Sequence, residues 1–554
     1  QVKEGEFVAL VGANGSGKST LLRLIAGLLN PSQGEVKIAG HNIQLAEEQK
    51  TLHTTLGMVF QYPEDQIVGT TVEEDIAFGL ENLGWQPEDM RKRVDEMLTA
   101  LDLQEQRQRP SHLLSAGQTQ RLALAGVLAP DPRLLLFDEA TTMLDPRGRK
   151  ELMARMKQLH QNGITILMVT HHMEEAAQAQ RMVVLHRGSI IADDTPQSIF
   201  HQISLLRQCG LAAPDFLQLA TILQPYIPGL PPNPANLEEL LKILKQIPPQ
   251  HGTLTDKVRG CSPDAKMPAI KVDHLVHIYE GEESQSNTTL RDVSMQVIQN
   301  CSHSLLGATG SGKSTLMLNM MGLEKPLEGR IQIGDVIVTD KQTKMQAILK
   351  QVGMVFQNPE IQFFEQYAGD EVAYGALMQG LEHEEVVRRV RWAMEIVGLD
   401  FEAFKDRLTF SLSGGERRKL ALASTLVLQT PVLLLDEPTA GLDPSSRKEI
   451  IQHLHHMQQD GRTLLLSTHD LNDVAALTEN TTIMDGGKVA FSGSTRQAFW
   501  MPDLVNAAGL DIPAAAQAAQ VMRNAGWPLP EGIVTISELE SCLAARGSEV
   551  LHAN

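Results

Sequence analysis

The sequence predicts an α/β protein that consists of two copies of one domain joined end to end. The segment GANGSGKSTLL at 12–22 returns as GATGSGKSTLM at 307–317, and LLLFDEATTMLDP at 134–146 returns as LLLLDEPTAGLDP at 432–444. In each copy a short apolar run leads into a glycine-rich turn and then into a segment with helical spacing of apolar residues. Strands that alternate with helices in this way predict a mostly parallel sheet.

The individual elements are expected from the apolar pattern. Residues 7–12 and 304–307 are predicted to be short buried strands, and residues 19–29 are predicted to be the helix that follows the first glycine-rich turn. The leucine runs before Asp138 and Asp436 are predicted to be buried parallel strands, because such strands have continuous apolar sequences.

The repeat continues beyond the two domain cores. Residues 210–223 match residues 509–522, and a helix-like segment follows each match. Each copy is therefore expected to carry a small helical tail, and the proline-rich stretch between the copies is typical of a tether. The predicted boundaries are a first domain at 1–204, a first helical tail at 205–247, a linker at 248–268, a second domain at 269–500 and a second helical tail at 501–554.

The overall composition excludes several classes of protein. The 554 residues carry 48 basic and 67 acidic side chains, which gives a net charge of −19 and argues against nucleic-acid binding. The four cysteines are scattered, so a disulfide framework or a zinc site is not expected. No apolar run approaches the ~18 residues needed to span a bilayer. If this chain works at a membrane, another protein must supply the membrane part.

Two phosphate-binding loops are predicted from the pattern Gly-x-x-x-x-Gly-Lys-Ser at 12–19 and 307–314. In such P-loops the backbone N–H groups surround the phosphates, the lysine reaches the β and γ phosphates, and the serine holds Mg²⁺. The predicted ATP-binding residues are Gly12, Asn14, Gly15, Gly17, Lys18, Ser19 and Thr20 in the first copy, and Gly307, Thr309, Gly310, Gly312, Lys313, Ser314 and Thr315 in the second.

Paired carboxylates end the two leucine-rich strands. Asp138 and Asp436 stand where a carboxylate would orient hydrated Mg²⁺. The adjacent Glu139 and Glu437 are predicted to act as general bases on the attacking water. An acidic loop at a strand end is the alternative, and the spacing from a P-loop argues against it.

A glutamine and a histidine in each copy complete the predicted catalytic set. Gln61 and Gln357 end the GMVFQ segments and are expected to ligate Mg²⁺ and to sense the γ phosphate. His171 and His469 each follow an apolar strand and a threonine, where they could contact the γ phosphate. A lone histidine at such a place more often packs or caps a helix, so only the repetition supports a functional role.

Each copy has a second segment suited to binding an anion. A serine followed by small residues opens a helix-forming run, and helix N-termini attract phosphate. Head-to-tail pairing of the two copies, with ATP between the P-loop of one and this segment of the other, explains why each copy has both. The predicted contacts are Ser115, Gly117 and Gln118 in the first copy, and Ser413, Gly414, Gly415 and Glu416 in the second.

The order of these motifs resembles the signature of ATP-binding-cassette (ABC) ATPases, twice and over nearly the whole chain. The motifs are the P-loop, Gln, L-S-G-G-[QE], D-E, L-D-P and T-H. The resemblance implies two tandem P-loop NTPase domains, each with a helical signature subdomain, that hydrolyse ATP to power a membrane transporter. It also implies that Asp145 and Asp443 are D-loop residues and that Tyr279 stacks on adenine. Ala116 departs from the family's glycine, and its methyl group is expected to weaken the site that pairs Lys313 with Ser115.

A narrower resemblance lies after each glutamine. QYPEDQIVGTTVEEDIAFG at 61–79 and QNPEIQFFEQYAGDEVAYG at 357–375 are similar to the ATPase subunits of energy-coupling-factor transporters, which import vitamins, cobalt and nickel. The resemblance implies two partners: a transmembrane subunit whose coupling helices dock beside the glutamine, and a small membrane protein that binds the substrate. It implies a peripheral location on the cytoplasmic side of the cell membrane.

Two other functions are compatible with a fused pair of ABC domains. Twin-cassette translation factors act on ribosomes, but they resemble one another in a long, often basic arm, whereas the linker here is proline-rich and the chain is acidic. The fused ATPase of a sugar importer is the second alternative. The segments at 61–79 and 357–375 and the duplicated helical tail favour the energy-coupling-factor type.

Overall fold

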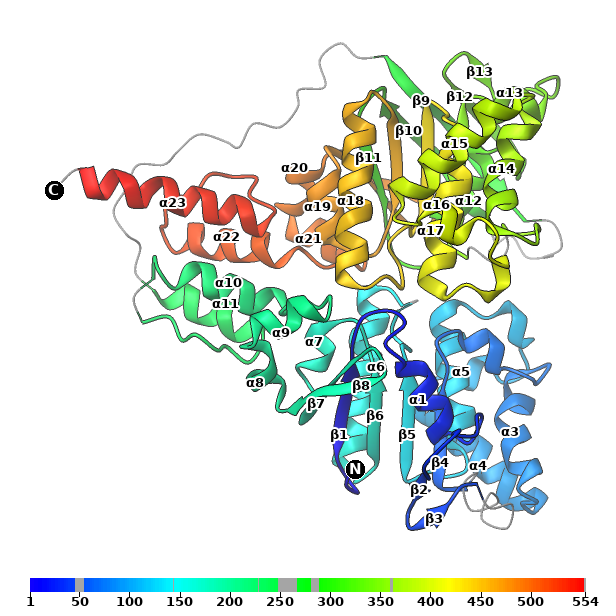
Figure 1. Cartoon of the computed structure of the whole chain (residues 1–554), viewed down its shortest axis with the longest axis vertical. Coiled ribbons are helices and arrows are strands. Elements are labelled where there is room, and N and C mark those ends of the chain that lie inside the picture. Colours follow the sequence, from blue (N-terminus) through cyan, green and yellow to red (C-terminus); the bar gives the residue numbers. More distant parts are fainter. Residues whose placement is uncertain are drawn as a thin grey trace. The chain divides into compact units, whose positions relative to one another are not determined.

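The computed structural model describes residues 1–44, 54–142, 144–227, 229–247, 267–279, 288–358 and 362–552. The chain divides into two compact units, Gln1–Pro214 and Asp215–Asn554 (Figure 1). This division falls inside the segment predicted as the first helical tail. Most of the predicted linker, 248–266, lies outside the described residues.

The first unit is built on a six-stranded sheet with the order β4-β5-β6-β1-β7-β8. The first five strands of this order are parallel, and β8 closes the edge in the antiparallel direction. All five residues of β1 and of β6 are buried, as expected for central strands of a parallel sheet. The strands are β1 (Phe7–Val11), β4 (Leu56–Val59), β5 (Leu134–Asp138), β6 (Thr165–Val169), β7 (Arg181–His186) and β8 (Ser189–Asp194), with a small hairpin of β2 (Lys37–Ile38) and β3 (His41–Asn42).

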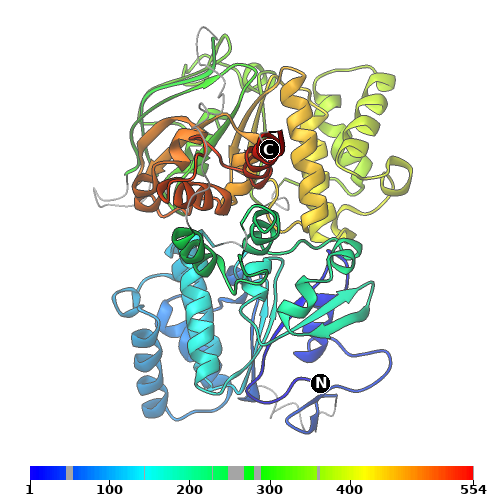
Figure 2. The ribbon, with the colours of Figure 1, turned by 90° about the vertical axis from the view of Figure 1, so that its left-hand side faces the viewer.

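Helices follow the strands of the first unit, and Figure 2 shows the long cyan α6 beside its sheet. The helix expected at 19–29 is shorter than predicted, because the chain turns away after Ile25 and Gly27 adopts a φ of 71°. The helices are α1 (Lys18–Ile25), α3 (Val72–Asn82), α4 (Pro87–Ala100), α5 (Ala116–Leu128), α6 (Pro146–Gln161), α7 (Met173–Ala176), α8 (Pro196–Phe200) and α9 (Ile203–Gln208).

The second unit repeats this sheet with the order β14-β15-β16-β11-β17-β18 and adds an antiparallel sheet with the order β10-β9-β12-β13. The identical order confirms the predicted duplication and the α/β fold. The strands are β9 (Pro268–Ile278), β10 (Thr288–Ile298), β11 (Ser302–Leu306), β12 (Glu328–Ile333), β13 (Val336–Ile337), β14 (Val352–Val355), β15 (Val432–Asp436), β16 (Thr463–Ser467), β17 (Asn480–Asp485) and β18 (Lys488–Ser494).

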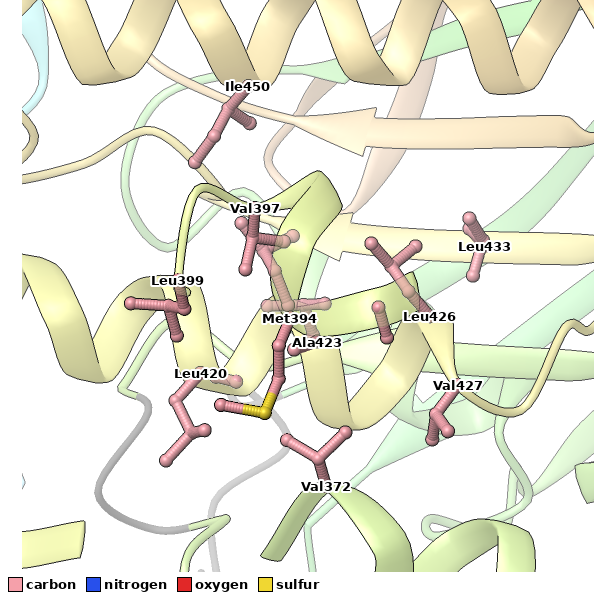
Figure 3. Close-up of a cluster of buried hydrophobic side chains, with 14 of the residues drawn as sticks. Val372, Met394, Val397, Leu399, Leu420, Ala423, Leu426, Val427, Leu433 and Ile450 are labelled. Carbon is pink, nitrogen blue, oxygen red and sulfur yellow. The ribbon is translucent and has the colours of Figure 1, made fainter. Parts of the chain in front are cut away.

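The helices of the second unit include a helical subdomain in which α14, α15 and α17 pack together. Figure 3 shows its core, where Val372, Met394 and Leu420 meet with residues of β15 and α18. The helices are α12 (Lys313–Met320), α13 (Met345–Leu349), α14 (Ala368–Met378), α15 (His383–Ile396), α16 (Phe401–Phe404), α17 (Gly414–Leu426), α18 (Pro444–Gln459), α19 (Leu471–Leu477), α20 (Thr495–Phe499) and α21 (Pro502–Ala507).

The two predicted tails are helical, and their helices pack together within the second unit. α10 (Asp215–Leu223) and α11 (Leu237–Gln246) contact α22 (Ala514–Asn524), and α10 also contacts α23 (Ile536–His552) (Figure 1). Asn472 donates a hydrogen bond of 2.7 Å from its Nδ2 to Asp215, which joins α10 to α19. The tail that follows the first copy is therefore part of the compact unit formed by the second.

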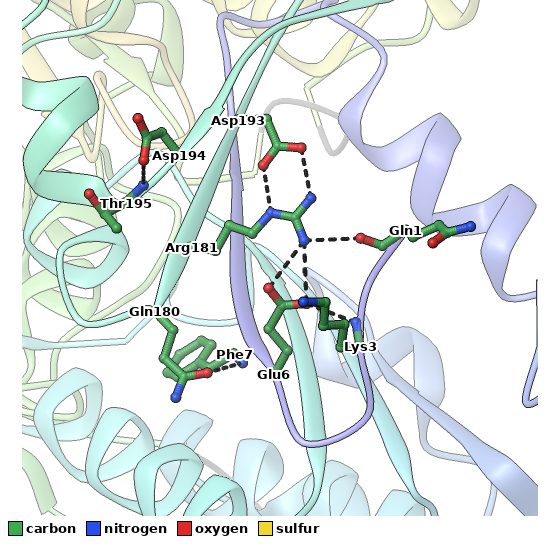
Figure 4. A network of polar contacts seen from close by, with 9 residues as sticks. All are labelled: Gln1, Lys3, Glu6, Phe7, Gln180, Arg181, Asp193, Asp194 and Thr195. Atoms are coloured by element: carbon green, nitrogen blue, oxygen red, sulfur yellow. Dashed lines mark hydrogen bonds and ion pairs between the residues drawn. The ribbon is translucent and has the colours of Figure 1, made fainter.

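Arg181 connects β7 to β8 and to the residue before β1 at the edge of the first sheet (Figure 4). Arg181 on β7 binds Asp193 on β8 through Nε and Nη2, at 2.5 and 2.7 Å, and its Nη1 lies 3.1 Å from Glu6. The bidentate pair lowers the pKa of the Asp193 carboxyl. These contacts hold the residue that precedes β1 against β7, so the strand that leads to the first P-loop has a fixed start.

A buried histidine in β11 predicts that the second unit is sensitive to acid. Burial lowers the pKa of His303 to about 4, from 6.5 in an exposed position. The unfolded chain therefore binds a proton more readily than the folded one. Protonation of this group leaves the free energy of unfolding unchanged above pH 6.5 and lowers it as the pH falls towards 4. The pKa shift corresponds to a loss of about 3 kcal/mol in that free energy. We expect His303→Val, which copies Val8 of β1, to flatten the pH dependence of urea unfolding between pH 4 and 6.5.

The control for this experiment is His383→Asn, because His383 is exposed at the start of α15. The control should leave the pH profile as it is in the parent chain. Equal profiles for His303→Val and the parent would mean that His303 is not the acid-sensitive group.

Candidate active sites

Both P-loops connect a central strand to a helix, as predicted. Gly17 and Gly312 cap α1 and α12 with φ near 100° and 99°, a conformation that favours glycine. Lys18 Nζ donates to the carbonyl oxygens of Gly12 and Ala13, both at 2.9 Å. Lys313 makes the same two bonds in the second copy, at 2.7 and 3.0 Å. Each lysine thus lies folded into its own loop, with its charge at the helix N-terminus.

At the first glycine of each loop there is no space for a side chain. A Cβ at Gly12 would lie 2.2 Å from the carbonyl oxygen of Leu185, and one at Gly307 would lie 2.3 Å from that of Met484. The hydroxyl groups of Ser16 and Ser311 are buried and have no hydrogen-bond partner among the described residues. A loop with close-packed backbone, unpartnered hydroxyls and a lysine fits the phosphates of a nucleotide.

A serine and an aspartate meet beside each P-loop. Ser19 Oγ donates to Asp138 at 2.9 Å, and Ser314 Oγ donates to Asp436 at the same distance. Burial raises the pKa of both aspartates, although the hydrogen bonds from the serines oppose the rise. Hydroxyl and carboxylate oxygens are the ligands that Mg²⁺ prefers, so these pairs fit the magnesium ion that accompanies ATP in this class of enzyme.

In the first copy the three predicted catalytic side chains are in contact. His171 Nε2 lies 2.5 Å from Glu139 Oε1, and Gln61 Nε2 donates to Glu139 Oε2 at 3.1 Å. Burial alone would raise the pKa of Glu139, but the charges of His171 and Lys18 outweigh it and lower that pKa. The carboxylate is therefore already held by neighbours in this conformation.

The second copy brings the same groups together more loosely. His469 Nε2 lies 3.5 Å from Glu437 Oε1, and that oxygen accepts no hydrogen bond within the part of the chain that the structure describes. Burial and the charge of Asp436 raise the pKa of Glu437 to about 8. Glu139 and Glu437 both have a positive φ, 50° and 51°, which is unusual for a long side chain and typical of functional sites.

The signature serines begin helices, as predicted. Ser115 caps α5 and Ser413 caps α17, each by accepting a hydrogen bond from the backbone N–H three residues on. In return, the serine N–H groups donate to the side-chain oxygens of Gln118 and Glu416, at 3.0 and 2.8 Å. These reciprocal bonds fix the helix start and leave the first turn as a possible anion site.

The residues that the family resemblance added also have defined positions. Asp145 and Asp443 cap α6 and α18 by accepting backbone N–H bonds of 2.7 and 2.9 Å. Tyr279 is 41% exposed, and its hydroxyl lies 3.2 Å from that of Thr315 on the second P-loop helix. An exposed ring beside the P-loop is suited to stacking on a base, which stays a prediction.

Sequence reasoning missed a partly buried ion cluster next to the predicted catalytic histidine of each copy, His171 or His469. In the second copy Arg447 of α18 binds Asp470 at 2.5 Å and Asp473 at 2.8 Å, and Asp473 also accepts a bond of 2.7 Å from Thr439. This cluster joins the loop after Glu437 to the loop of His469. In the first copy His172 stands in place of Asp470, and the corresponding Arg149 lies 3.7 Å from Glu175.

Arg447→Ala is expected to destabilise the second unit strongly. Burial raises the pKa of Asp473 to about 6 although Arg447 opposes the rise, so loss of the arginine leaves a buried carboxyl without its cation. Removing one partner of such a pair costs about 3–5 kcal/mol. Urea unfolding measures the loss, and Arg388→Ala, which removes an exposed arginine from α15, should change it little. Equal stability of the two variants would contradict the argument.

A second pair of residues that the sequence did not reveal holds the segment after each glutamine. Asp75 of α3 accepts backbone bonds from Val68 and Gly69 at 2.8 and 2.9 Å. Glu371 of α14 accepts the equivalent bonds from Phe364 and Glu365 at 3.0 and 2.8 Å. Burial raises the pKa of both carboxyl groups. Their repetition at the same spacing was the signal that could have identified them.

The fold and the two sites define a P-loop enzyme of the nucleotide-hydrolysing class. The ABC transporter family model matches residues 1–142 and 290–440, so the chain belongs to this family and is an ATPase. A proposed ABC transporter ATP-binding protein of Methanosarcina mazei is 31% identical over 99% of this chain and 94% of its own length. The energy-coupling factor transporter ATP-binding protein EcfA1 of Clostridium novyi is 44% identical over 44% of this chain and 88% of its own length.

A solved structure with two fused cassettes shares the fold. The archaeal ribosome recycling factor aABCE1, in complex with the ribosomal stalk protein aP1, aligns with a TM-score of 0.55 over 92% of this chain and 89% of its own. Its sequence identity is 20%, so the likeness concerns the fold alone. Among the described helices, none combines the length and the apolar character needed to cross a membrane.

Proposed function

We propose that this chain is the ATP-hydrolysing motor of an energy-coupling-factor-type importer of a vitamin or a metal ion. In this proposal, Lys18 and Lys313 bind the phosphates, and Glu139 and Glu437 act as general bases. ATP supplies the phosphoryl group, and Mg²⁺ held by the serine, aspartate and glutamine of each copy would neutralise charge on it. Head-to-tail pairing of the two copies stays a prediction from the sequence.

The observation that carries the proposal is an exposed apolar side chain at the same place in both copies. Val68 is 63% exposed and Phe364 is 59% exposed, each seven residues after the glutamine of its copy. The backbone N–H of each donates to a buried carboxylate, Asp75 or Glu371, so the backbone that carries the exposed side chain is held in place. Phe364 packs edge-on against Tyr374, which is 40% exposed.

Rigid, exposed aromatic side chains are typical of surfaces that bind another protein. Because the surface follows directly after Gln61 and Gln357, a partner bound there would be adjacent to the predicted magnesium ligands. We infer that it receives helices of the transmembrane subunit. The 44% identity to the Clostridium novyi protein over one copy supports the energy-coupling-factor type of partner.

Purification of the tagged chain from its own host in mild detergent tests the proposal. We expect a large transmembrane subunit and a small hydrophobic protein to co-purify, and the small protein would indicate the substrate. Phe364→Asp should reduce recovery of the transmembrane subunit at least tenfold, because it places a charge in an apolar contact. Met501→Asp is the matched control, since Met501 is also exposed but lies between α20 and α21.

Two results would contradict the proposal. Ribosomal proteins in place of membrane proteins would assign the chain to the translation factors. Recovery of large transmembrane subunits alone, without a small substrate-binding membrane protein, would assign the chain to another importer type, such as a sugar importer.

A further inference from the structure

A buried arginine on the signature helix of the second copy contacts both catalytic loops. Arg418 of α17 is 4% exposed, and its Nη1 donates to the carbonyl oxygens of Phe356 at 3.0 Å and Gln357 at 2.6 Å. Its Nη2 donates to the carbonyl oxygen of Glu437 at 2.5 Å. One guanidinium group therefore joins the residues that follow β14 and β15 to the helix that Ser413 caps.

These bonds act on the backbone of the two residues whose side chains are predicted to do the chemistry. Glu437 has a φ of 51°, a conformation that persists only where the surroundings hold it. The guanidinium is planar and presents its N–H groups in a fixed fork, so it sets the distance between the carbonyls of Gln357 and Glu437. Because the group is buried, shifting either carbonyl would leave a charged donor without a partner.

The described residues of the first copy show no such link. Gln120 occupies the equivalent position on α5, five residues after Ser115, as Arg418 is five residues after Ser413. Its side chain is buried at 4% exposure, and its Nε2 has no hydrogen-bond partner among the residues that the structure describes. In this copy the side chains of Gln61 and His171 contact Glu139 directly instead.

We propose that Arg418 is a positioning residue that holds Gln357 and Glu437 in register in the second copy alone, so that the two ATP sites hydrolyse at unequal rates. In the second copy, Arg418 holds the backbone of the general base Glu437, whereas the Glu437 side chain has only a distant contact with His469. The first copy must break the Glu139 contacts with His171 and Gln61 before that base can serve. The inference rests on the roles proposed above for Gln357 and Glu437.

Site-resolved nucleotide trapping tests the inference on the full chain. The chain is incubated with Mg²⁺, 8-azido-ATP and vanadate, irradiated, digested, and its labelled peptides are assigned to the first or second copy by mass spectrometry. Vanadate traps the product of a turnover, so the label reports hydrolysis in each copy, whereas labelling without vanadate and in the cold reports binding. We expect the second copy to be trapped faster than the first in the parent chain. The effect of Arg418 must then outweigh the weakening expected from Ala116 at the site that pairs Lys313 with Ser115.

Arg418→Gln gives the second copy the residue that the first one has. It should slow trapping in the second copy at least tenfold, with trapping in the first copy and cold labelling in both unchanged. Gln120→Arg should raise trapping in the first copy. Arg388→Gln, which changes an exposed arginine of α15, is the control and should alter neither.

Three outcomes separate the possible failures. If Arg418→Gln slows both copies equally or lowers cold labelling, the arginine has only a structural role and the inference is wrong. If it changes nothing while Glu437→Gln abolishes trapping in the second copy, the inference is wrong but the general-base assignment stands. If Glu437→Gln also changes nothing, the proposed site itself is wrong.

Discussion

Glu437→Gln is expected to lower ATP turnover in the second copy by about 10²–10⁴-fold while ATP still binds there. Glutamine keeps the size of the side chain and its hydrogen-bonding oxygen but cannot accept the proton of the attacking water. General bases contribute about that factor to hydrolytic rates. The change removes a carboxyl whose pKa burial already raises to about 8, so the fold should lose no stability. Vanadate trapping assigned to each copy by mass spectrometry measures turnover, and fluorescence of a labelled nucleotide measures binding.

Glu139→Gln is the matched variant in the first copy. Its carboxylate contacts His171 and Gln61, so the substitution disturbs existing contacts as well as the chemistry. We therefore expect a measurable loss of stability. Because the first copy is expected to hydrolyse ATP more slowly, we also expect a smaller fall in total turnover than Glu437→Gln causes. Full turnover in the double variant would show that neither glutamate is the base.

The sequence was sufficient to predict the groups that act through neighbours along the chain. Each P-loop lysine bonds to carbonyls five and six residues before it, and each signature serine bonds to the residue three positions after it. Such contacts depend on local spacing, which repeats in both copies. The strands that end in Asp138 and Asp436 were equally evident, because a buried parallel strand is apolar throughout.

The missed groups act across long stretches of chain. Arg418 bonds to a carbonyl 61 residues before it and to another 19 residues after it, and nothing in the sequence pairs these positions. The helix-like segment expected after residues 210–223 is confirmed as α11, but any apolar face could cover it. That α11 packs on α22 follows only from the three-dimensional arrangement.

The substitution with the largest expected effect on nucleotide binding is Gly307→Ala. A methyl group there would lie 2.3 Å from the carbonyl oxygen of Met484 and 2.5 Å from Ser311 Oγ, and the residue has a φ of 147°. The backbone of β17 cannot move away without breaking its ladder with β11, so the P-loop must shift instead. A displaced loop no longer directs its N–H groups at the phosphates, and we expect ATP affinity at this site to fall at least 100-fold.

Gly310→Ala in the same loop separates this close contact from the general cost of replacing a glycine. Gly310 has a φ of 80°, and nothing lies within 4 Å of the position that its Cβ would take. The variant should carry backbone strain of about 1–2 kcal/mol without a steric clash. Equilibrium binding of a fluorescent ATP analogue to the two variants decides between the causes. Equal losses of affinity would assign the effect to φ strain. We expect a much larger loss in Gly307→Ala, which would assign the effect to the close approach of β17.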